Sequence, residues 1–277
     1  MVANKHNLKT NMENTKHYAL ITGASSGIGY ELAKLFAKDG FNLVIVGRDA
    51  TKLQQVANIL EQQGIEVIAH AADLFQPNAA FELYKEIKAG NIQIDVLVND
   101  AGQGSYGKFI ETDLDKELNI IQLNIISLVT LTKLFVKDMV TRGTGKILNL
   151  SSIAGKMPGP YQAVYHGTKA FVHSFSESIR AELADTSVTI TSLLPGPTGT
   201  DFFKNADMLD SKIVQDGDMA DPADVARDGY EALLAGKDMV VSGFKNKLQV
   251  AAGNLTPDSL QAKQMGKMQE PVNKEEK

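Results

Sequence analysis

The amino-acid sequence predicts an α/β protein whose core is a doubly wound parallel sheet of about seven strands, with helices on both faces. Short apolar segments alternate along the chain with longer segments of helical periodicity, as expected of successive β-α-β units. The apolar segments are continuous rather than interrupted by polar residues, which is typical of strands covered on both faces. The first apolar segment also leads into a glycine-rich turn that opens a helix.

Each strand is predicted from a run of apolar, often β-branched residues with polar or turn-forming neighbours. The seven runs are YALI (18–21), NLVIV (42–46), EVIAH (66–70), IDVLV (94–98), KILNL (146–150), VTITSLL (188–194) and MVVSG (239–243). Between them, apolar residues recur at helical spacing over segments long enough to cross back along a sheet. These segments predict helices at about 27–39, 50–62, 77–89, 114–141, 161–184 and 222–235.

The composition excludes several classes of protein. The chain has 277 residues, a formal net charge of −5 and a pI of about 5.6, so the basic surface of a nucleic-acid-binding protein is not expected. It has no cysteine, and its five histidines lack metal-ligand spacing, so neither a disulfide nor a metal site is predicted. We find no signal-peptide pattern and no apolar run of about 18 residues, and therefore expect a cytoplasmic protein without a membrane span.

Four ranges describe the predicted organisation of the chain. Residues 1–15 are polar and aperiodic and are predicted to be a disordered lead, and residues 16–250 form one folded domain. Within it, residues 201–220 are long for an ordinary connection and are predicted to act as a lid. Residues 251–277 are predicted to form a C-terminal extension, weakly amphipathic at about 258–268 and ending in a charged tail.

The turn TGASSGIG (22–29) predicts a phosphate-binding site. At a helix N-terminus, unpaired N–H groups and the positive end of the dipole favour an anion such as a pyrophosphate. Gly23 permits a tight turn, Gly27 allows the backbone to approach a phosphate, and Gly29 lets the helix pack closely on the strand. The spacing G-x3-G-x-G differs from the common G-x-G-x-x-G, and an ordinary glycine-rich loop is the alternative.

The ends of the second and third predicted strands carry charged residues that suit the rest of a dinucleotide. Arg48 suits a ribose 2′-phosphate and Asp49 a ribose 2′-hydroxyl. Because Asp49 directly precedes a helix, it is expected to cap that helix and leave Arg48 free for NADP(H); a solvated surface arginine is the alternative. Asp73 is too far from the helix near residue 77 to cap it, and is expected to meet the adenine amino group.

Tyr165 and Lys169 lie four residues apart on the helix predicted at about 161–184, and therefore on one face of it. An adjacent ammonium lowers the pKa of a phenol, which makes such a pair suitable for exchanging a proton with a carbonyl or an alcohol. Ser151 and Ser152 follow a predicted strand, at the carboxyl edge of the sheet where ligands bind.

Six motifs, in order and over residues 17–200, resemble those of the short-chain dehydrogenase/reductase family. They are TGASSGIG (22–29), NDAG (99–102), Asn124 in QLNIISL, Ser152 in SSIAG, the pair Tyr165 and Lys169, and PGPTGT (195–200). The resemblance implies a Rossmann-type fold and an NADP-dependent oxidoreductase of the carbonyl reductase type. In that family, an arginine just after the second strand usually accompanies a preference for NADPH.

The resemblance also implies the role of each site residue. Tyr165 would donate the proton, Ser152 would orient the carbonyl, and Lys169 would bind the nicotinamide ribose and lower the pKa of Tyr165. Asn124 would hold a water molecule in a proton relay. The residues expected to bind NADP(H) are Gly23, Ser25, Ser26, Gly27, Ile28, Gly29, Arg48, Asp73, Leu74, Asn99, Ala101, Gly102, Tyr165, Lys169, Pro195, Gly196, Thr198 and Thr200.

Asp100 departs from the family pattern, and His166 lies next to the predicted catalytic tyrosine. Asp100 occupies a position where the family commonly has asparagine, and the sequence names no partner for its carboxylate. His166 adjoins the tyrosine but faces another side of the helix, so it is expected to pack or to line the rim of a pocket rather than to act as a second base.

The predicted reaction is reversible NADPH-dependent reduction of a ketone or aldehyde, with an apolar or aromatic substrate. The apolar wall residues expected around that substrate are Phe202, Phe203, Met208 and Leu209 of the lid, together with Tyr106, Met157 and Tyr161. A non-catalytic dinucleotide-sensing regulator on the same fold is the alternative, and a third possibility is epimerisation or dehydration.

A homodimer or homotetramer is expected from the helix within 117–140, because its apolar residues surround it and one sheet face cannot bury them all. These residues are Ile120, Ile121, Leu123, Ile125, Leu128, Leu131, Phe135 and Met139.

Overall fold

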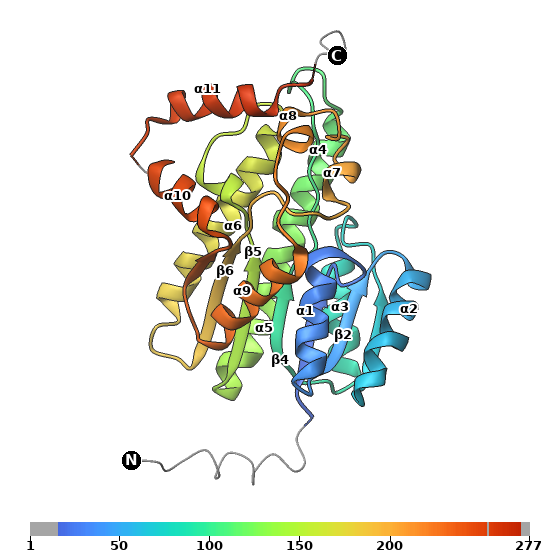
Figure 1. Cartoon of the computed structure of the whole chain (residues 1–277). Coiled ribbons are helices and arrows are strands. Elements are labelled where there is room, and N and C mark those ends of the chain that lie inside the picture. Colours follow the sequence, from blue (N-terminus) through green and yellow to red (C-terminus); the bar gives the residue numbers. More distant parts are fainter. Residues whose placement is uncertain (1–15, 254, 273–277) are drawn as a thin grey trace.

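The computed structural model describes residues 16–253 and 255–272, and it contains a seven-stranded parallel sheet with helices on both faces (Figure 1). The strands are β1 (Tyr18–Thr22), β2 (Asn42–Gly47), β3 (Val67–Ala71), β4 (Ile94–Asn99), β5 (Gly145–Leu150), β6 (Val188–Leu194) and β7 (Met239–Val241). Their order across the sheet is β3-β2-β1-β4-β5-β6-β7, and every neighbouring pair is parallel. The doubly wound fold is therefore confirmed, with its topological switch point between β1 and β4. The lead predicted for residues 1–15 lies outside the described residues.

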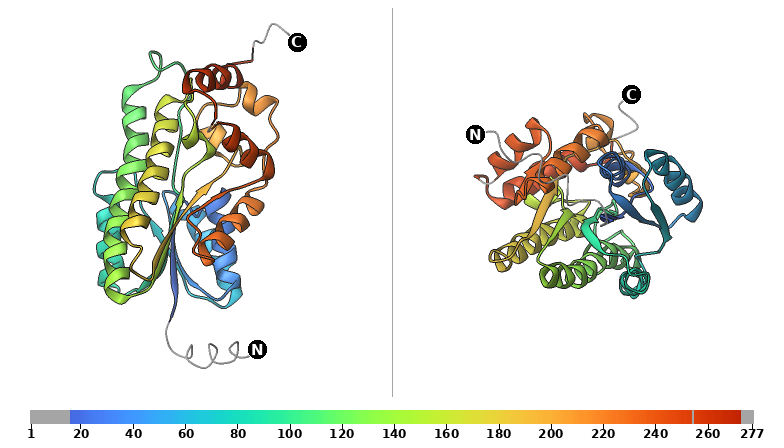
Figure 2. Two further views of the ribbon diagram at one scale, coloured as in Figure 1. Left: turned by 90° about the vertical axis from the view of Figure 1, so that its left-hand side faces the viewer. Right: turned by 90° about the horizontal axis from the view of Figure 1, so that it is seen from below.

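The helices divide into two layers that cover the two faces of the sheet (Figure 2). One layer contains α1 (Gly27–Lys38), α2 (Ala50–Leu60) and α9 (Pro222–Leu234), and the other contains α3 (Ala79–Ala89), α4 (Leu114–Ile121), α5 (Leu128–Arg142) and α6 (Ala163–Glu182). Short 3₁₀ turns, η1 (Glu61–Gln63) and η3 (Ile153–Lys156), follow α2 and β5. Helices α1, α2 and α9 start and end close to the predicted positions, because their apolar spacing and caps are local signals.

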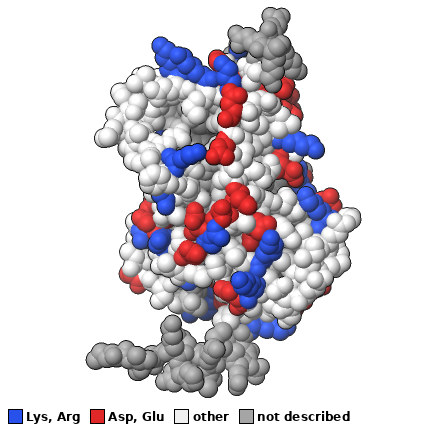
Figure 3. All heavy atoms as spheres, viewed as in Figure 1, with Lys and Arg blue, Asp and Glu red and all other residues white. Residues whose placement is uncertain are grey.

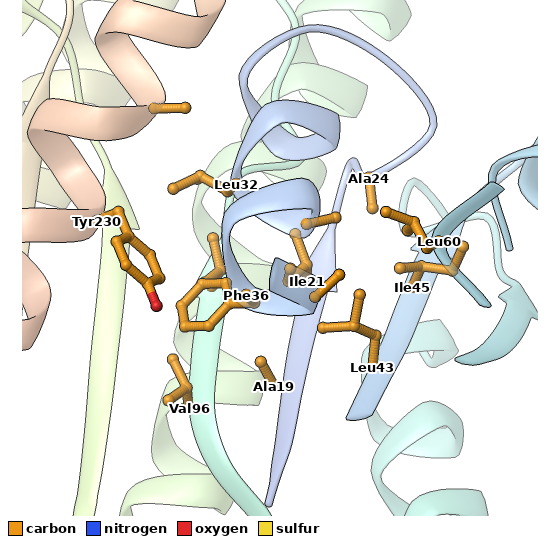
Figure 4. Close-up of a cluster of buried hydrophobic side chains, with 14 of the residues drawn as sticks. Ala19, Ile21, Ala24, Leu32, Phe36, Leu43, Ile45, Leu60, Val96 and Tyr230 are labelled. Carbon is orange, nitrogen blue, oxygen red and sulfur yellow. The ribbon is translucent and has the colours of Figure 1, made fainter. Parts of the chain in front are cut away.

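The core between the sheet and the layer of α1, α2 and α9 holds the glycine-rich turn in place. Leu32 and Phe36 of α1 are fully buried against the strand residues Ile21 and Ile45 (Figure 4). The ring of Tyr230, from α9, lies 4.8 Å from that of Phe36 at an interplanar angle of 77°. Burying each such side chain contributes about 1.5–3 kcal/mol, so α1 is fixed on β1 and the turn between them has a defined conformation.

The helix predicted over 114–141 is continuous in the structure but changes its geometry in the middle. A π-helical turn, η2 (Gln122–Ser127), joins α4 to α5 and contains the buried residue Asn124. By length and composition, Leu114–Arg142 is apolar enough to cross a membrane, but half of its most apolar window is buried inside the fold. That burial is typical of a core helix.

Most of the apolar residues that led us to expect an oligomer are buried within the chain itself. Six of its eight apolar residues named above are buried within the chain, because β4, β5 and α3 cover them, and Ile121 and Ile125 are partly exposed. The expected oligomer therefore depends on exposed apolar side chains, such as Leu118, Ile126 and Phe171.

The segment between β6 and α9, together with the chain after β7, forms the end of the molecule at the carboxyl edge of the sheet (Figure 1). The predicted lid contains two short helices that the sequence pattern did not indicate, α7 (Phe202–Asn205) and α8 (Lys212–Gln215). Helix α10 (Phe244–Gly253) spans residue 250, where the sequence places a domain boundary, and α11 (Asp258–Gln269) coincides with the stretch predicted as weakly amphipathic. Helix α11 packs against α8, so the C-terminal extension is part of this end of the fold.

Candidate active site

The glycine-rich turn is shaped by its three glycines. Gly23 and Gly27 have φ angles of +74° and +59°, a backbone conformation that favours glycine. The Gly23 N–H donates to the Val46 carbonyl at 2.9 Å, which closes the turn on β2. A Cβ atom at Gly29 would lie 2.7 Å from the Gly23 carbonyl oxygen, so only glycine allows α1 to begin there. Gly27 and Ile28, the first residues of α1, line a cavity, and Ser26 at the N-cap forms no side-chain hydrogen bond with their N–H groups.

A cavity of about 820 Å³ extends from this turn across the carboxyl ends of the strands. Figure 3 shows a hollow in the viewed face, at the upper left where α10 and α11 lie, framed mostly by uncharged side chains. Most of the predicted site residues line the cavity. They are Gly23, Ser25, Ser26, Gly27, Ile28, Arg48, Leu74, Ala101, Gly102, Ser152, Tyr165, Lys169, Pro195, Gly196, Thr198 and Thr200. The predicted residues outside its lining are Gly29, Asp73, Asn99 and Asn124.

At the end of β2, Arg48 and Asp49 take different roles. The Asp49 carboxylate accepts the Lys52 N–H at 3.0 Å, which confirms that it caps α2. The Arg48 guanidinium is exposed at the cavity and lies 4.9 Å from the centre of the Phe75 ring. Stacking on an aromatic face leaves the N–H edges of the guanidinium available to a phosphate. Lys52 adds a second cation at this end, 3.8 Å from the carboxylate of Asp201.

Asp73 and Asn99 are used inside the protein in ways that the sequence did not indicate. The Asp73 carboxylate accepts the Phe75 N–H at 3.3 Å and the Gln76 side-chain N–H at 3.2 Å, so it bonds within its own turn and does not cap α3. The Asn99 amide donates to Thr132 at 3.0 Å and Asn149 at 2.9 Å, which directs its side chain into the buried strands. Their contacts with a cofactor remain predictions.

Tyr165, Ser152 and Lys169 all line the cavity. Tyr165 and Lys169 come from the first turns of α6, and Ser152 opens η3 immediately after β5. The Ser152 hydroxyl accepts the Ala154 N–H at 3.1 Å and lies 3.3 Å from the Pro195 carbonyl. Burial raises the pKa of Tyr165 to about 12, and a hydrogen bond with Ser152 opposes that rise. The phenol is therefore protonated at neutral pH and able to donate.

The side chain of Lys169 contradicts one expectation from the sequence. Its ammonium donates to the Leu150 carbonyl at 2.8 Å and lies 5.8 Å from the centre of the Tyr165 ring. Burial lowers the pKa of Lys169 to about 8, and the charge of Asp100 opposes this fall. The predicted lowering of the tyrosine pKa by Lys169 is not found, because desolvation outweighs the effect of an ammonium directed toward β5.

Asn124 holds the loop after β4 in position. Its side chain accepts the Gln103 N–H at 3.0 Å and donates to the Gln103 carbonyl at 2.9 Å and the Thr168 hydroxyl at 3.0 Å. The π-helical turn places this amide between the loop and α6, as such turns often do at functional sites. These hydrogen bonds occupy the side chain, so it positions neighbouring residues in this structure, and the predicted water relay remains a prediction.

Asp100 has partners that the sequence could not name. Its carboxylate accepts the Gly29 N–H at the start of α1, and a Cβ atom at Gly29 would lie 2.4 Å from its Oδ2 atom. Burial raises the pKa of Asp100 to about 7, while the positive charge of Lys169 and the Gly29 N–H oppose the rise. A carboxyl group that titrates near neutral pH therefore lies under the glycine-rich turn.

The far end of the cavity is lined by apolar and amide side chains. Met157, Phe202, Phe203 and Met208 line it as predicted. The other three predicted wall residues do not. Leu209 is 49% exposed, and Tyr106 stacks on Tyr161 with ring centres 5.8 Å apart, outside the lining.

Among the lining residues not identified from the sequence are Gln162, Met265, Met268 and Gln269. Met265, Met268 and Gln269 share one face of α11, at spacings of three and four residues. That spacing was a usable signal, but nothing in the sequence indicated what the face covers.

The fold and the cavity define a dinucleotide-binding α/β protein, and the comparisons with known proteins give its family. A family model described as short chain dehydrogenase matches residues 17–209. A probable NADP-dependent dehydrogenase of Haemophilus influenzae is 35% identical over 214 residues, covering 75% of this chain and 84% of that protein. This chain therefore belongs to the short-chain dehydrogenase family.

Two further relatives show the range of the similarity. A very-long-chain 3-oxoacyl-CoA reductase of Anas platyrhynchos is 39% identical over 185 residues, which cover 64% of this chain and 58% of that protein. A solved structure, described as a short-chain dehydrogenase from Sphingobium yanoikuyae in complex with NADPH, has a TM-score of 0.77 at 28% identity. It covers 86% of this chain and 94% of that one.

Proposed function

We propose that this protein is an NADPH-dependent reductase that converts an uncharged ketone or aldehyde to an alcohol, reversibly, with Tyr165 as the proton donor. The observation that carries the proposal is that Tyr165, Ser152 and Lys169 meet in one cavity whose other end is the glycine-rich turn and Arg48. The relatives described as NADP-dependent or as bound to NADPH support the choice of cofactor.

The residues present fit NADP(H). Gly27 leaves space that a side chain would fill, since a Cβ atom there would lie 3.0 Å from the Thr200 side chain across the turn. The N-terminus of α1 and the serine hydroxyls of this turn would hold the pyrophosphate, and Arg48 would hold the 2′-phosphate. When bound, the nicotinamide supplies the hydride for the carbonyl carbon.

Two protein side chains stabilise the negative charge that develops on the carbonyl oxygen during reduction. Tyr165 remains protonated at neutral pH because burial raises its pKa to about 12, so it holds a proton to give to that oxygen. Ser152 supplies a second hydroxyl at the same place, which favours the transition state over the ground state. The reverse reaction uses the same groups, with Tyr165 accepting the proton from the alcohol.

Lys169 has a supporting role in this proposal. Its ammonium donates to the Leu150 carbonyl and lies 5.8 Å from the centre of the Tyr165 ring, in the lining of the cavity. We expect this ammonium to hold the ribose of the nicotinamide nucleotide, which would position the cofactor beside Tyr165. Its pKa of about 8 keeps most of the ammonium charged at pH 7.

The test compares Tyr165→Phe with Lys169→Ala. Tyr165→Phe removes only the hydroxyl, so NADPH binding should remain normal while carbonyl reduction falls by about 10²- to 10⁴-fold or more. Lys169→Ala should weaken both. NADPH binding is measured by fluorescence, and turnover by NADPH oxidation with a panel of ketones and aldehydes.

Exposed Lys137→Ala, on the far part of α5, serves as a control for surface changes. Near-normal turnover by Tyr165→Phe would reject the mechanism. NADPH binding without turnover of any compound in the panel by the wild-type protein would favour the regulator instead.

A further inference from the structure

The carboxylate of Asp100 lies on the inner side of the glycine-rich turn. Asp100 directly follows β4, and its N–H donates to the Thr22 hydroxyl at 3.1 Å, which fixes this segment against β1. A Cβ atom at Gly23 would lie 2.8 Å from the Asp100 Oδ2 atom, and the Gly29 N–H donates to the same carboxylate. The carboxylate is therefore held between the first and the third glycine of the turn.

This carboxylate uses part of the anion-binding capacity of α1. The N–H groups of the first turn of an α-helix have no acceptor within the helix, and in α1 this turn begins with Gly27, Ile28 and Gly29. Asp100 accepts from Gly29, whereas Gly27 and Ile28 line the cavity, as Asp100 itself does. A phosphate in the cavity would therefore meet the N-terminus of α1 at Gly27 and Ile28, with a carboxylate already bound at the next residue.

One ammonium group balances the Asp100 carboxylate. In the described part of the chain, Lys169 of α6 is the charged side chain that acts on Asp100, and it opposes the rise in the pKa of Asp100 to about 7 that burial causes. A Cβ atom at Gly102 would lie 3.3 Å from the Lys169 Nζ atom, so the ammonium lies beside the segment after β4. Tyr165, also on α6, has a pKa of about 12 and is uncharged at neutral pH. A second anion nearby therefore changes the protonation of Asp100 near neutral pH.

We propose that the Asp100 carboxylate and the pyrophosphate of NADP(H) share the N-terminus of α1, so that the cofactor binds together with a proton on Asp100. Two anions at one helix N-terminus repel each other, and a single helix dipole stabilises each of them less than it would stabilise one alone. A proton taken from solvent onto Asp100 removes the repulsion, and the neutral carboxyl keeps an oxygen for the Gly29 N–H. Asp100 thus limits the affinity for the cofactor above neutral pH. This inference rests on the proposed binding of NADP(H), but it does not require carbonyl reduction.

The experiment compares the dissociation constants of NADPH for the wild type and Asp100→Asn, measured by fluorescence from pH 6.5 to 9. The two values should agree within about twofold at pH 6.5, and Asp100→Asn should bind about 10-fold more tightly at pH 9, since one pKa unit of coupling is a tenfold change in binding. Lys169 has lost most of its charge at pH 9 in both proteins, because its pKa is about 8 and falls without Asp100. Asp201→Asn is the matched control: its carboxylate lines the cavity but is exposed, 3.8 Å from Lys52, and its ratio to wild type should not vary with pH.

Calorimetry in buffers of different ionisation enthalpy counts the protons taken up when NADPH binds. It is performed with Lys169→Met, because Lys169 titrates in the same range of pH. Without this ammonium the Asp100 carboxyl ionises at a higher pH, so uptake of about half a proton or more is expected near pH 9. The double variant Lys169→Met/Asp100→Asn should take up close to none.

An advantage of Asp100→Asn that is constant over this pH range would overturn the inference, because charge would not be its cause. Equal proton uptake by the two Lys169→Met proteins would do the same. Asp100→Ser, which also removes the charge, is the second variant if asparagine disturbs the turn. NADPH binding without these differences rejects this inference alone, whereas a wild-type protein that does not bind NADPH rejects the proposed cofactor as well.

Discussion

Replacing Asp100 with asparagine should make the protein more stable, and the gain should depend on pH. Burial raises the pKa of this carboxyl from its usual 3.8 to about 7. Each pKa unit corresponds to about 1.36 kcal/mol, so charging Asp100 in the folded protein costs about 4 kcal/mol more than in the unfolded chain. Because the side chain is partly exposed, solvent screening reduces this to about 2 kcal/mol. Asparagine keeps an oxygen that can accept the Gly29 N–H but carries no charge.

The direction of the pH dependence follows from proton binding. Between about pH 4 and pH 7 the folded protein holds a proton on Asp100 that the unfolded chain has lost, so the wild-type stability falls as pH rises through this range. Asp100→Asn has no carboxyl group at this position, so its stability does not fall with pH for this reason. Its stability advantage should be small near pH 4 and reach about 2 kcal/mol at pH 7.5, or about 5 °C in Tm. Loss of the attraction to Lys169, whose pKa would then fall further, offsets part of the gain above pH 7.

The assay is thermal unfolding of both proteins at intervals from pH 4.5 to 7.5, in one ionic strength. Asp185→Asn, in an exposed turn, is the matched control, and its small difference from wild type should not vary with pH. A Tm difference between Asp100→Asn and wild type that is constant over this range would refute the reasoning. So would a variant less stable than wild type at pH 7.5.

Two further predictions concern the cofactor and the assembly. Arg48→Asp should weaken NADPH binding and lower or invert the preference for NADPH over NADH, because it replaces a charge-assisted contact with repulsion; an unchanged ratio of the two dissociation constants, measured by fluorescence, would leave Arg48 a surface residue. Exposed apolar side chains at Leu118 and Ile126, with Phe171 on α6, should pair two copies of the chain. Light scattering at micromolar concentration should show a dimer or tetramer, and a monomer there would contradict this prediction.

The order of elements and much of the cofactor end of the cavity could be predicted because their signals are local. Gly23 and Gly27 adopt the left-handed backbone that glycine permits, and Asp49 caps the helix that follows it. Their meaning depends on a few neighbouring residues, and the order of strands and helices placed them at one edge of the sheet. The pair Tyr165 and Lys169 was recognisable for the same reason, since four residues on one helix fix a shared face.

The sequence was least informative where a side chain has several possible hydrogen-bonding partners. Asp73 bonds within its own turn, which its distance to the next helix did not indicate. Lys169 was expected to act on its neighbour Tyr165, yet its ammonium donates to Leu150, and burial has the larger effect on both pKa values. Spacing along a helix states which groups are close, but it does not state how deeply they are buried.

The sequence by itself therefore determined the parallel α/β fold, the nucleotide-binding turn and the tyrosine-lysine pair, since each depends on local conformation or on the regular alternation of strand and helix. Only the tertiary structure decided that α11 covers the cavity, that Gln269 meets Gln162 across more than a hundred residues, and that Asp100 lies under the glycine-rich turn. The physical reason is that burial and long-range hydrogen bonding arise from packing segments distant in the chain, and neither periodicity nor spacing records which of those segments meet.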